Sequence, residues 1–140
     1  MILVDTSVLS RVFRRRRLGS AELRLRDTVE RLLASDAPLG LPGIVLQEVL
    51  SGIRSAKQFA DLERHLVGAF TIVHPTTTDC VESARLKNRC LAKGLNASGA
   101  DCLIATLAIA GRHELFAVDE DFVALAKHAD LKLFSADRLG

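Results

Sequence analysis

The acidic residues of this sequence are the first candidates for chemistry, because three carboxylates stand alone in long apolar stretches. Each is the only charged side chain of its stretch: Asp5 in 1–10, Glu48 in 37–53 and Asp101 in 94–111. Burying a carboxylate costs several kcal/mol unless a cation or hydrogen bonds replace its hydration. No Lys, Arg or His lies close in sequence to any of the three. If they converge, a divalent metal ion is the simplest charge that satisfies them all.

A fourth acidic group, Asp119-Glu120-Asp121, follows the apolar run 115–118. These acids could also have purely structural roles. Asp5 could cap a helix, Asp101 could interact favourably with the positive end of a helix dipole, and the triplet could form an acidic first turn. No such role exists for Glu48 in the middle of an apolar helix. The joint pattern therefore favours a shared site.

The elements that must position these acids are those of a parallel sheet covered on both faces, because short apolar runs alternate with helical periodicity. In such a sheet, active sites lie at the carboxyl ends of the strands. Asp5 and Asp119 are expected there, Asp101 in a first helical turn, and Glu48 in a central helix that is apolar nearly all round. The predicted strands are 2–4, 38–41, 71–74, 115–118 and 131–134. Two of the predicted helices begin at a cap: one runs from a cap at Thr6 or Ser7 towards Arg14, and one from a cap at Thr77 or Thr78 to Ala92. The other predicted helices are 20–34, 42–53, 56–69, 100–110 and 122–128.

Length and composition predict one globular domain over residues 1–140, large enough to bury about two thirds of its unfolded surface. No apolar run is long enough to suggest a membrane helix, and no export signal is visible. The three cysteines, Cys80, Cys90 and Cys102, form no CxxC pattern, and neither they nor the histidines have zinc-type spacing. Reduced thiols of this kind indicate a cytoplasmic protein.

Basic residues are concentrated near the start of the chain, where residues 1–35 hold eight Arg against four acids. Arg11 and the run Arg14, Arg15, Arg16 and Arg17 could contact nucleic-acid phosphates. Two alternatives stay open, a solvated helix end and a contact with an acidic protein partner. With no Trp, no Tyr and six Phe, a base-stacking platform for single strands is not expected.

The acidic motifs resemble the PIN-domain ribonucleases, especially the single-domain toxins of VapC type. The resemblance is carried by a strand ending in Asp-Thr-Ser, an apolar helix with one Glu, an Asp before a second apolar helix, and a strand followed by acids. These motifs lie at 2–9, 44–53, 100–108 and 115–122, in the family's order and over essentially the whole chain. In one departure, Ala117 stands where the family often has Thr or Ser.

The resemblance implies a three-layer α/β/α domain with a central parallel sheet that cleaves RNA with Mg²⁺ or Mn²⁺. It also implies a homodimer held inactive by a cognate antitoxin. Hard divalent cations prefer carboxylate oxygens and water, and they lower the pKa of a bound water so that it can attack phosphorus.

The roles implied for the acids follow the same resemblance. Asp5 and Asp101 would bind the metal directly, Glu48 would bind through water or orient the attacking water, and Asp119 would complete the site or hold a second ion. Asp121 is the alternative fourth acid. Without metal, such crowded acids repel one another, and at least one pKa should rise. The neighbours expected to hydrogen-bond the carboxylates are Thr6 and Ser7.

Three other protein classes share some of these features. A response-regulator receiver needs an Asp after its middle strand and a later Lys, and neither is suitably placed. A haloacid-dehalogenase-type phosphatase needs Asp-x-Asp after the first strand, and Ser7 occupies the second position. The third is a non-catalytic PIN-like module that binds RNA or protein. The presence of all four acidic positions favours the enzyme.

Overall fold

A computed structural model describes residues 1–13 and 19–136. Its centre is a five-stranded sheet in which every neighbouring pair is parallel, in the order β3-β2-β1-β4-β5. The central strand β1 pairs with β2 through Leu3 and Gly40, and with β4 through Leu3 and Leu115. Leu3 and Leu115 are fully buried, because both faces of the sheet are covered. The strands are β1 (Ile2–Val4), β2 (Leu39–Pro42), β3 (Thr71–Val73), β4 (Glu114–Phe116) and β5 (Lys132–Leu133).

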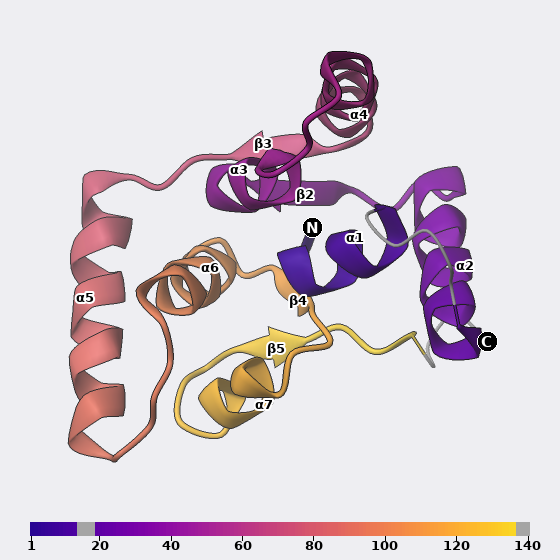
Figure 1. Cartoon of the computed structure of the whole chain (residues 1–140). Coiled ribbons are helices and arrows are strands. Elements are labelled where there is room, and N and C mark those ends of the chain that lie inside the picture. Colours follow the sequence, from indigo (N-terminus) through magenta and orange to yellow (C-terminus); the bar gives the residue numbers. More distant parts are fainter. Residues whose placement is uncertain (14–18, 137–140) are drawn as a thin grey trace.

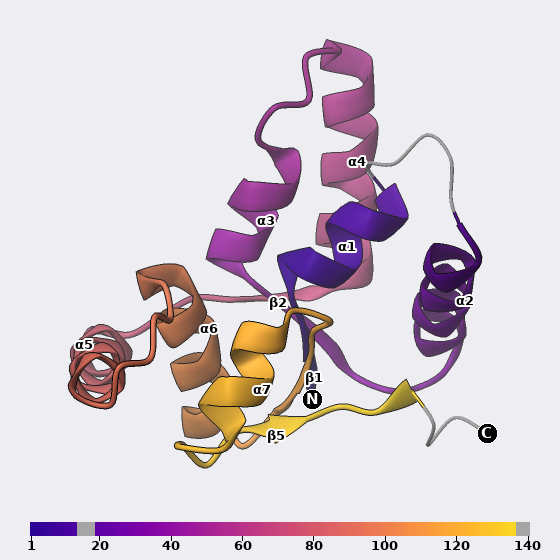
Figure 2. The ribbon, with the colours of Figure 1, turned by 60° about the horizontal axis from the view of Figure 1, so that its bottom comes forward.

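Seven helices lie in the described part of the chain, in two layers around the sheet (Figures 1 and 2). Contacts link α1 with α2 and α3, and α3 with α4, whereas α6 contacts α5 and α7. The first four helices thus form one layer and the last three form the other, which confirms the predicted three-layer α/β/α fold. None of the described helices is long and apolar enough to cross a membrane. The helices are α1 (Thr6–Phe13), α2 (Ser20–Ala34), α3 (Gly43–Leu50), α4 (Ala56–Ala69), α5 (Thr77–Ala92), α6 (Gly99–Ala110) and α7 (Glu120–Ala126).

The order of the strands creates a point where the chain reverses its direction across the sheet. From β1 the chain moves through β2 to β3 at one edge, then returns to β4 on the other side of β1. Because parallel crossovers are right-handed, the helices after β1 and β2 cover one face and those after β3 and β4 cover the other. The segments that leave the carboxyl ends of β1 and β4 therefore diverge, and such a point is where ligands bind in open α/β sheets.

Several helix starts differ from the sequence-based expectation because polar side chains cap them earlier than the apolar periodicity indicates. Helix α1 begins at Thr6 and not after a Thr6 or Ser7 cap, since the Asp5 carboxylate accepts the Ser7 N–H. Helix α5 is capped by Thr76, in a reciprocal capping box with Asp79, and not by Thr77 or Thr78. These caps fix where the first turns, and any acids in them, lie.

Helices α3 and α7 also differ from the predicted bounds. Pro42 ends β2 and precedes α3, so it lies outside the first helical turn, and α3 ends at Leu50, before the positive φ of 87° at Gly52. The last predicted helix, 122–128, begins at Glu120 because Asp119 caps it. The acidic triplet therefore covers the start of α7.

Candidate metal centre

Asp5 lies at the carboxyl end of the central strand and is only 5 % exposed. Its backbone N–H donates to the carbonyl of Phe116 at 2.9 Å, which ties it to β4. Its Oδ2 accepts the Ser7 N–H at 3.0 Å. Burial raises the pKa of Asp5, hydrogen bonds from Ser7 and Thr6 oppose this, and the negative charge of Asp119 raises it further. A buried carboxylate whose pKa is raised by burial lacks full compensation for its charge.

Asp101 lies in the first turn of α6, where the Ser98 hydroxyl caps the helix by accepting the Asp101 N–H at 3.0 Å. Burial raises the pKa of Asp101 to about 6, against the effect of the Ser98 hydrogen bond, and the charges of Asp5, Asp119 and Asp121 add to the rise. Sequence reasoning missed Ser98. The pattern Ser-x-x-Asp before an apolar helix is nevertheless a known helix-start motif.

Asp119 and Asp121 mark the start of α7, beyond the carboxyl end of β4. Asp119 is the N-cap residue, and its Oδ1 accepts the Asp121 N–H at 2.9 Å. Asp101, Asp119 and Asp121 each offer a carboxylate oxygen, and these oxygens all lie within 4.8 Å of one another. Both alternative fourth acids thus belong to one cluster with Asp101.

Glu48 lies closer to solvent than its sequence context predicts. Helix α3 buries Val45, Val49 and Leu50, but Gln47 and Glu48 are exposed, so the helix is not apolar all round. The expectation that this helix is apolar nearly all round was wrong. The pKa of Glu48 is nevertheless raised, by partial desolvation of the carboxyl group and by the charge of Asp5. Glu48 therefore belongs to the electrostatic environment of Asp5.

The residues after Asp5 connect the first acidic segment with the last. The Ser7 hydroxyl accepts the Val118 N–H at 3.1 Å, next to Ala117. The Thr6 hydroxyl is buried without a well-formed hydrogen bond among the described residues, yet its proximity lowers the pKa of Glu48. The Ser7 hydroxyl thus holds the backbone just before the fourth acidic segment. Ala117, the residue before Val118, has no hydroxyl that could make such a contact.

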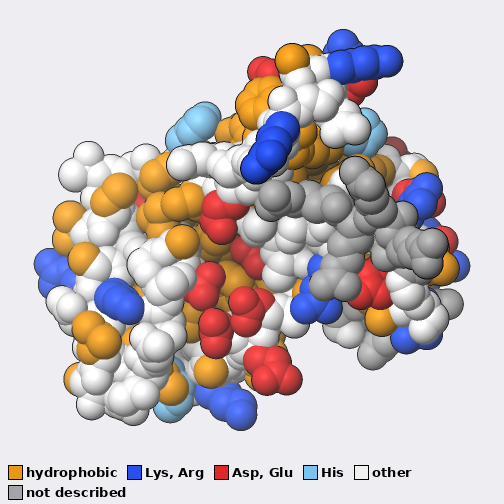
Figure 3. Space-filling view, in the orientation of Figure 1, with side chains coloured by type: hydrophobic (Ala, Val, Ile, Leu, Met, Phe, Trp, Pro, Cys, Tyr) orange, Lys and Arg blue, Asp and Glu red, His pale blue; other side chains and the backbone are white. Residues whose placement is uncertain are grey.

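The acidic side chains gather on one face of the molecule, over the place where α1, α6 and α7 meet (Figures 1 and 3). The carboxylate oxygens of Asp101, Asp119 and Asp121, with the charge of Asp5 acting on Asp101, form the donor set that hard divalent cations such as Mg²⁺ and Mn²⁺ prefer. The raised pKa values of Asp5, Glu48 and Asp101 show that the cluster is short of positive charge. The residues present therefore fit a divalent metal ion.

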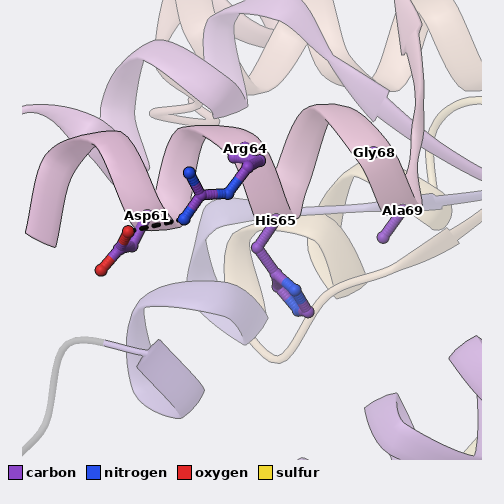
Figure 4. Close-up of a pocket in the computed structure, with 5 residues that line it drawn as sticks. All are labelled: Asp61, Arg64, His65, Gly68 and Ala69. Atoms are coloured by element: carbon purple, nitrogen blue, oxygen red, sulfur yellow. Dashed lines mark hydrogen bonds and ion pairs between the residues drawn. The ribbon is translucent and has the colours of Figure 1, made fainter.

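Other candidate positions lie away from this cluster or outside the described residues. Arg11 is exposed in the last turn of α1, and Arg14, Arg15, Arg16 and Arg17 fall outside the described residues. A separate hollow of about 460 Å³ lies on α4 (Figure 4). There Arg64 pairs with Asp61 at 2.6 Å, and the His65 ring packs edge-on against Phe13. No group of possible metal ligands was found there among the described residues.

The raised pKa of Asp101 predicts that the metal-free protein loses stability as the pH rises. The folded-state pKa of about 6 lies above the ordinary value of 3.8, so between these values the folded state binds more protons than the unfolded state. The free energy of unfolding should therefore fall as the pH rises through this window. Asp101→Asn removes this titration and should be more stable than the wild type above the window.

Urea unfolding in EDTA, on both sides of this window, measures the effect. Asp36→Asn is the matched control, because it makes the same change at an exposed position between α2 and β2. A difference in stability between the wild type and Asp101→Asn that does not change with pH would contradict the prediction.

Known proteins resemble this chain over its length. The family model described as the PIN domain matches residues 2–128. A search of curated protein sequences found no match. Among solved structures, VapBC-1 from nontypeable Haemophilus influenzae is 17% identical with a TM-score of 0.75, over 98% of this chain and 99% of that chain.

Two further structures show the same fold. A toxin-antitoxin complex from Klebsiella pneumoniae is 22% identical, with a TM-score of 0.66 over 87% of this chain and 90% of that chain. VapC20 from Mycobacterium tuberculosis is described as a toxin that cleaves the sarcin-ricin loop. It is 19% identical, with a TM-score of 0.66 over 89% of this chain and 94% of that chain. The match of the family model to nearly the whole chain, on a parallel sheet that carries this acidic cluster, confirms the predicted resemblance: the chain belongs to the PIN domain family.

Proposed function

We propose that this protein is a metal-dependent ribonuclease toxin of VapC type, active in the cytoplasm and neutralised by a cognate antitoxin. The observation that carries the proposal is the cluster of Asp101, Asp119 and Asp121 in a PIN-domain fold. Asp5 influences the pKa values of Asp101 and Glu48, which supports their assignment to the same site. Structural similarity to VapBC-1, to a toxin-antitoxin complex and to VapC20 supports it.

The acids have separate tasks in this proposal. Asp5 and Asp101 would bind Mg²⁺ or Mn²⁺ directly, and Asp119 would complete the site or share a second ion with Asp121. The bound cation would supply charge neutralisation at the phosphate and a water of lowered pKa. Glu48, which is exposed to solvent, would bind the ion through water or orient the attacking water. Its raised pKa also suits a carboxylate that accepts a proton.

Hydrogen bonds from the polypeptide fix the geometry of these acids. Ser98 holds the first turn of α6, Ser7 holds both Asp5 and the Val118 backbone, and Asp119 is fixed by its own cap. Because ligand orientation depends on such partners, these serines are positioning residues. Their loss would misplace the acids without removing a carboxylate.

The partners proposed are RNA, an antitoxin protein and a second copy of the chain. RNA is the substrate that suits metal-assisted phosphodiester hydrolysis by a chain whose sequence also carries an Arg-rich segment. The antitoxin is proposed from the similarity to toxin-antitoxin complexes. A homodimer remains a proposal drawn from the family resemblance. A non-catalytic PIN-like module that only binds RNA or protein is the alternative, and the next experiment excludes or supports it.

Removing single carboxylates should abolish cleavage while leaving the fold intact. Asp5→Asn, Glu48→Gln and Asp101→Asn should each reduce metal-dependent RNA cleavage by at least about 100-fold, as expected for loss of a group that binds the ion or handles the water. Each change also removes negative charge from a crowded cluster, so metal-free stability should hold or rise. Cleavage of labelled RNA with Mg²⁺, with Mn²⁺ and with EDTA measures the first effect, and thermal unfolding measures the second.

Glu120→Gln is the matched control, because Glu120 lies between Asp119 and Asp121 but does not belong to the cluster. It should cleave normally. Wild-type protein that binds RNA but never cleaves it would establish the non-catalytic module, and normal cleavage by Glu48→Gln would remove Glu48 from the site.

The arginine run predicts a salt-dependent effect on binding. If Arg14 to Arg17 contact RNA phosphates, replacing them with Gln should weaken RNA binding and lower its salt dependence by roughly one counterion per lost contact. A variant with normal RNA cleavage that escapes inhibition would instead show that the run binds the antitoxin. Titrations with RNA and with antitoxin at two salt concentrations distinguish these outcomes. Gln at the exposed positions Arg54 and Lys57 provides the control for general charge loss.

A further inference from the structure

A cavity of about 350 Å³ lies directly beside the acidic cluster. One wall is the loop 94–97 between α5 and α6, and the other is formed by Asp121, Ala124 and Leu125 of α7. Because Asp121 belongs to both, the cavity and the cluster share a border. Any group in this cavity therefore lies next to the point where the scissile phosphate would bind.

We propose that this cavity binds one nucleobase of the RNA substrate, next to the cleaved bond, and that Asn96 selects which base is accepted. This inference rests on the proposed ribonuclease function and adds a determinant of sequence preference to it. The cavity volume lies at the lower end of the range for small-molecule pockets, about 300 to 1,000 Å³. It therefore suits one flat ring system and not a folded peptide segment.

The charges around the cavity favour a base over a phosphate. Its lining residues include one carboxylate, Asp121, and no Lys, Arg or His. A phosphate or an acidic side chain placed there would meet the Asp121 carboxylate, and no cationic side chain lines the cavity. A neutral base meets no such penalty, and Asp121 can accept a hydrogen bond from an exocyclic amino group.

The remaining lining groups fit the faces and the edge of a base. Leu95, Ala97, Ala124 and Leu125 supply aliphatic surface for its faces, and Ala97 and Leu125 are buried. Asn96 is exposed at the rim, where its amide offers one acceptor and two donors. With no aromatic residue among the lining groups, selection by hydrogen bonds to the base edge replaces stacking as the source of preference.

The cavity wall is held in place before any ligand binds. The half-buried Lys87 side chain of α5 donates to the Ala97 carbonyl, and the turn at Gly94 uses a φ of 73° that favours glycine. The loop then continues into Ser98, whose hydroxyl fixes the first turn of α6 at Asp101. A fixed wall lowers the ordering cost of binding and sets a constant position of the bound base relative to Asp101.

The experiment combines cleavage mapping with direct binding. Asn96→Ala removes the selecting amide, and Ala124→Leu fills the cavity from the α7 side. Asn88→Ala, at an exposed position of α5 that does not line the cavity, is the matched control. Cleavage of a random-sequence RNA pool with Mn²⁺, read by sequencing, gives the base preference beside the cut. Both cavity variants should reduce that preference by about tenfold, the effect of one lost hydrogen-bonded contact, and Asn88→Ala should keep it.

Direct binding is tested with the four ribonucleosides, which carry no phosphate. At least one should shift the NMR signals of the Asn96 side-chain amide and the Leu95 and Leu125 methyl groups in the wild type, and Ala124→Leu should abolish these shifts. If no nucleoside shifts them, the inference is wrong. It is also wrong if the wild type cleaves RNA without a base preference, or if the variants keep the preference and lose only antitoxin affinity. A wild type that does not cleave RNA at all would refute the proposed function, while the nucleoside titration would still decide the inference.

Discussion

The constraint on which the site depends is the partial burial of carboxylates that the fold brings together, to which their mutual repulsion adds. Asp5, Asp101 and Asp119 come from three different segments, and each receives a backbone or hydroxyl contact that partly compensates its charge or fixes its position. This compensation is incomplete, because the pKa values of Asp5 and Asp101 remain raised. A cluster of this kind stays folded but electrostatically unsatisfied, and a divalent cation would remove that deficit.

Sheet topology explains why this deficit occurs at one place. Strands β1 and β4 are neighbours, but the helices that follow them pack in opposite layers. The segments that follow the two strands diverge, and Asp101 in the first turn of α6 lies close to Asp119 and Asp121 at the start of α7. Ser7 joins the start of α1 to the Val118 backbone, just before Asp119. The same arrangement brings α7 against the loop 94–97, which forms the adjoining cavity.

The sequence predicted the parts of this site that depend on local pattern. Asp5 and Asp119 follow apolar strands, so their place at the sheet edge could be predicted. The exposure of Glu48 could not be predicted. Helix α3 is short, and which of its faces points to solvent depends on the elements it packs against. The sequence also could not decide between Asp119 and Asp121 as the fourth acid. One is the N-cap of α7 and the other lies in its first turn, so their side chains are close together. The cavity beside them is formed by segments far apart in sequence, and only the folded chain reveals it.

Proton release on metal binding tests the central claim most directly. With a pKa of about 6 in the metal-free protein, Asp101 is partly protonated near that pH and must lose its proton to bind a cation. Calorimetric titration with Mn²⁺ in buffers of different ionisation enthalpy measures the protons released. The account predicts proton release near the pKa of Asp101, none well above it, and a smaller release in Asp101→Asn, in which only Asp5 and Glu48 keep raised pKa values. Absence of Mn²⁺ binding, or binding with the same proton release in Asp101→Asn, would contradict it.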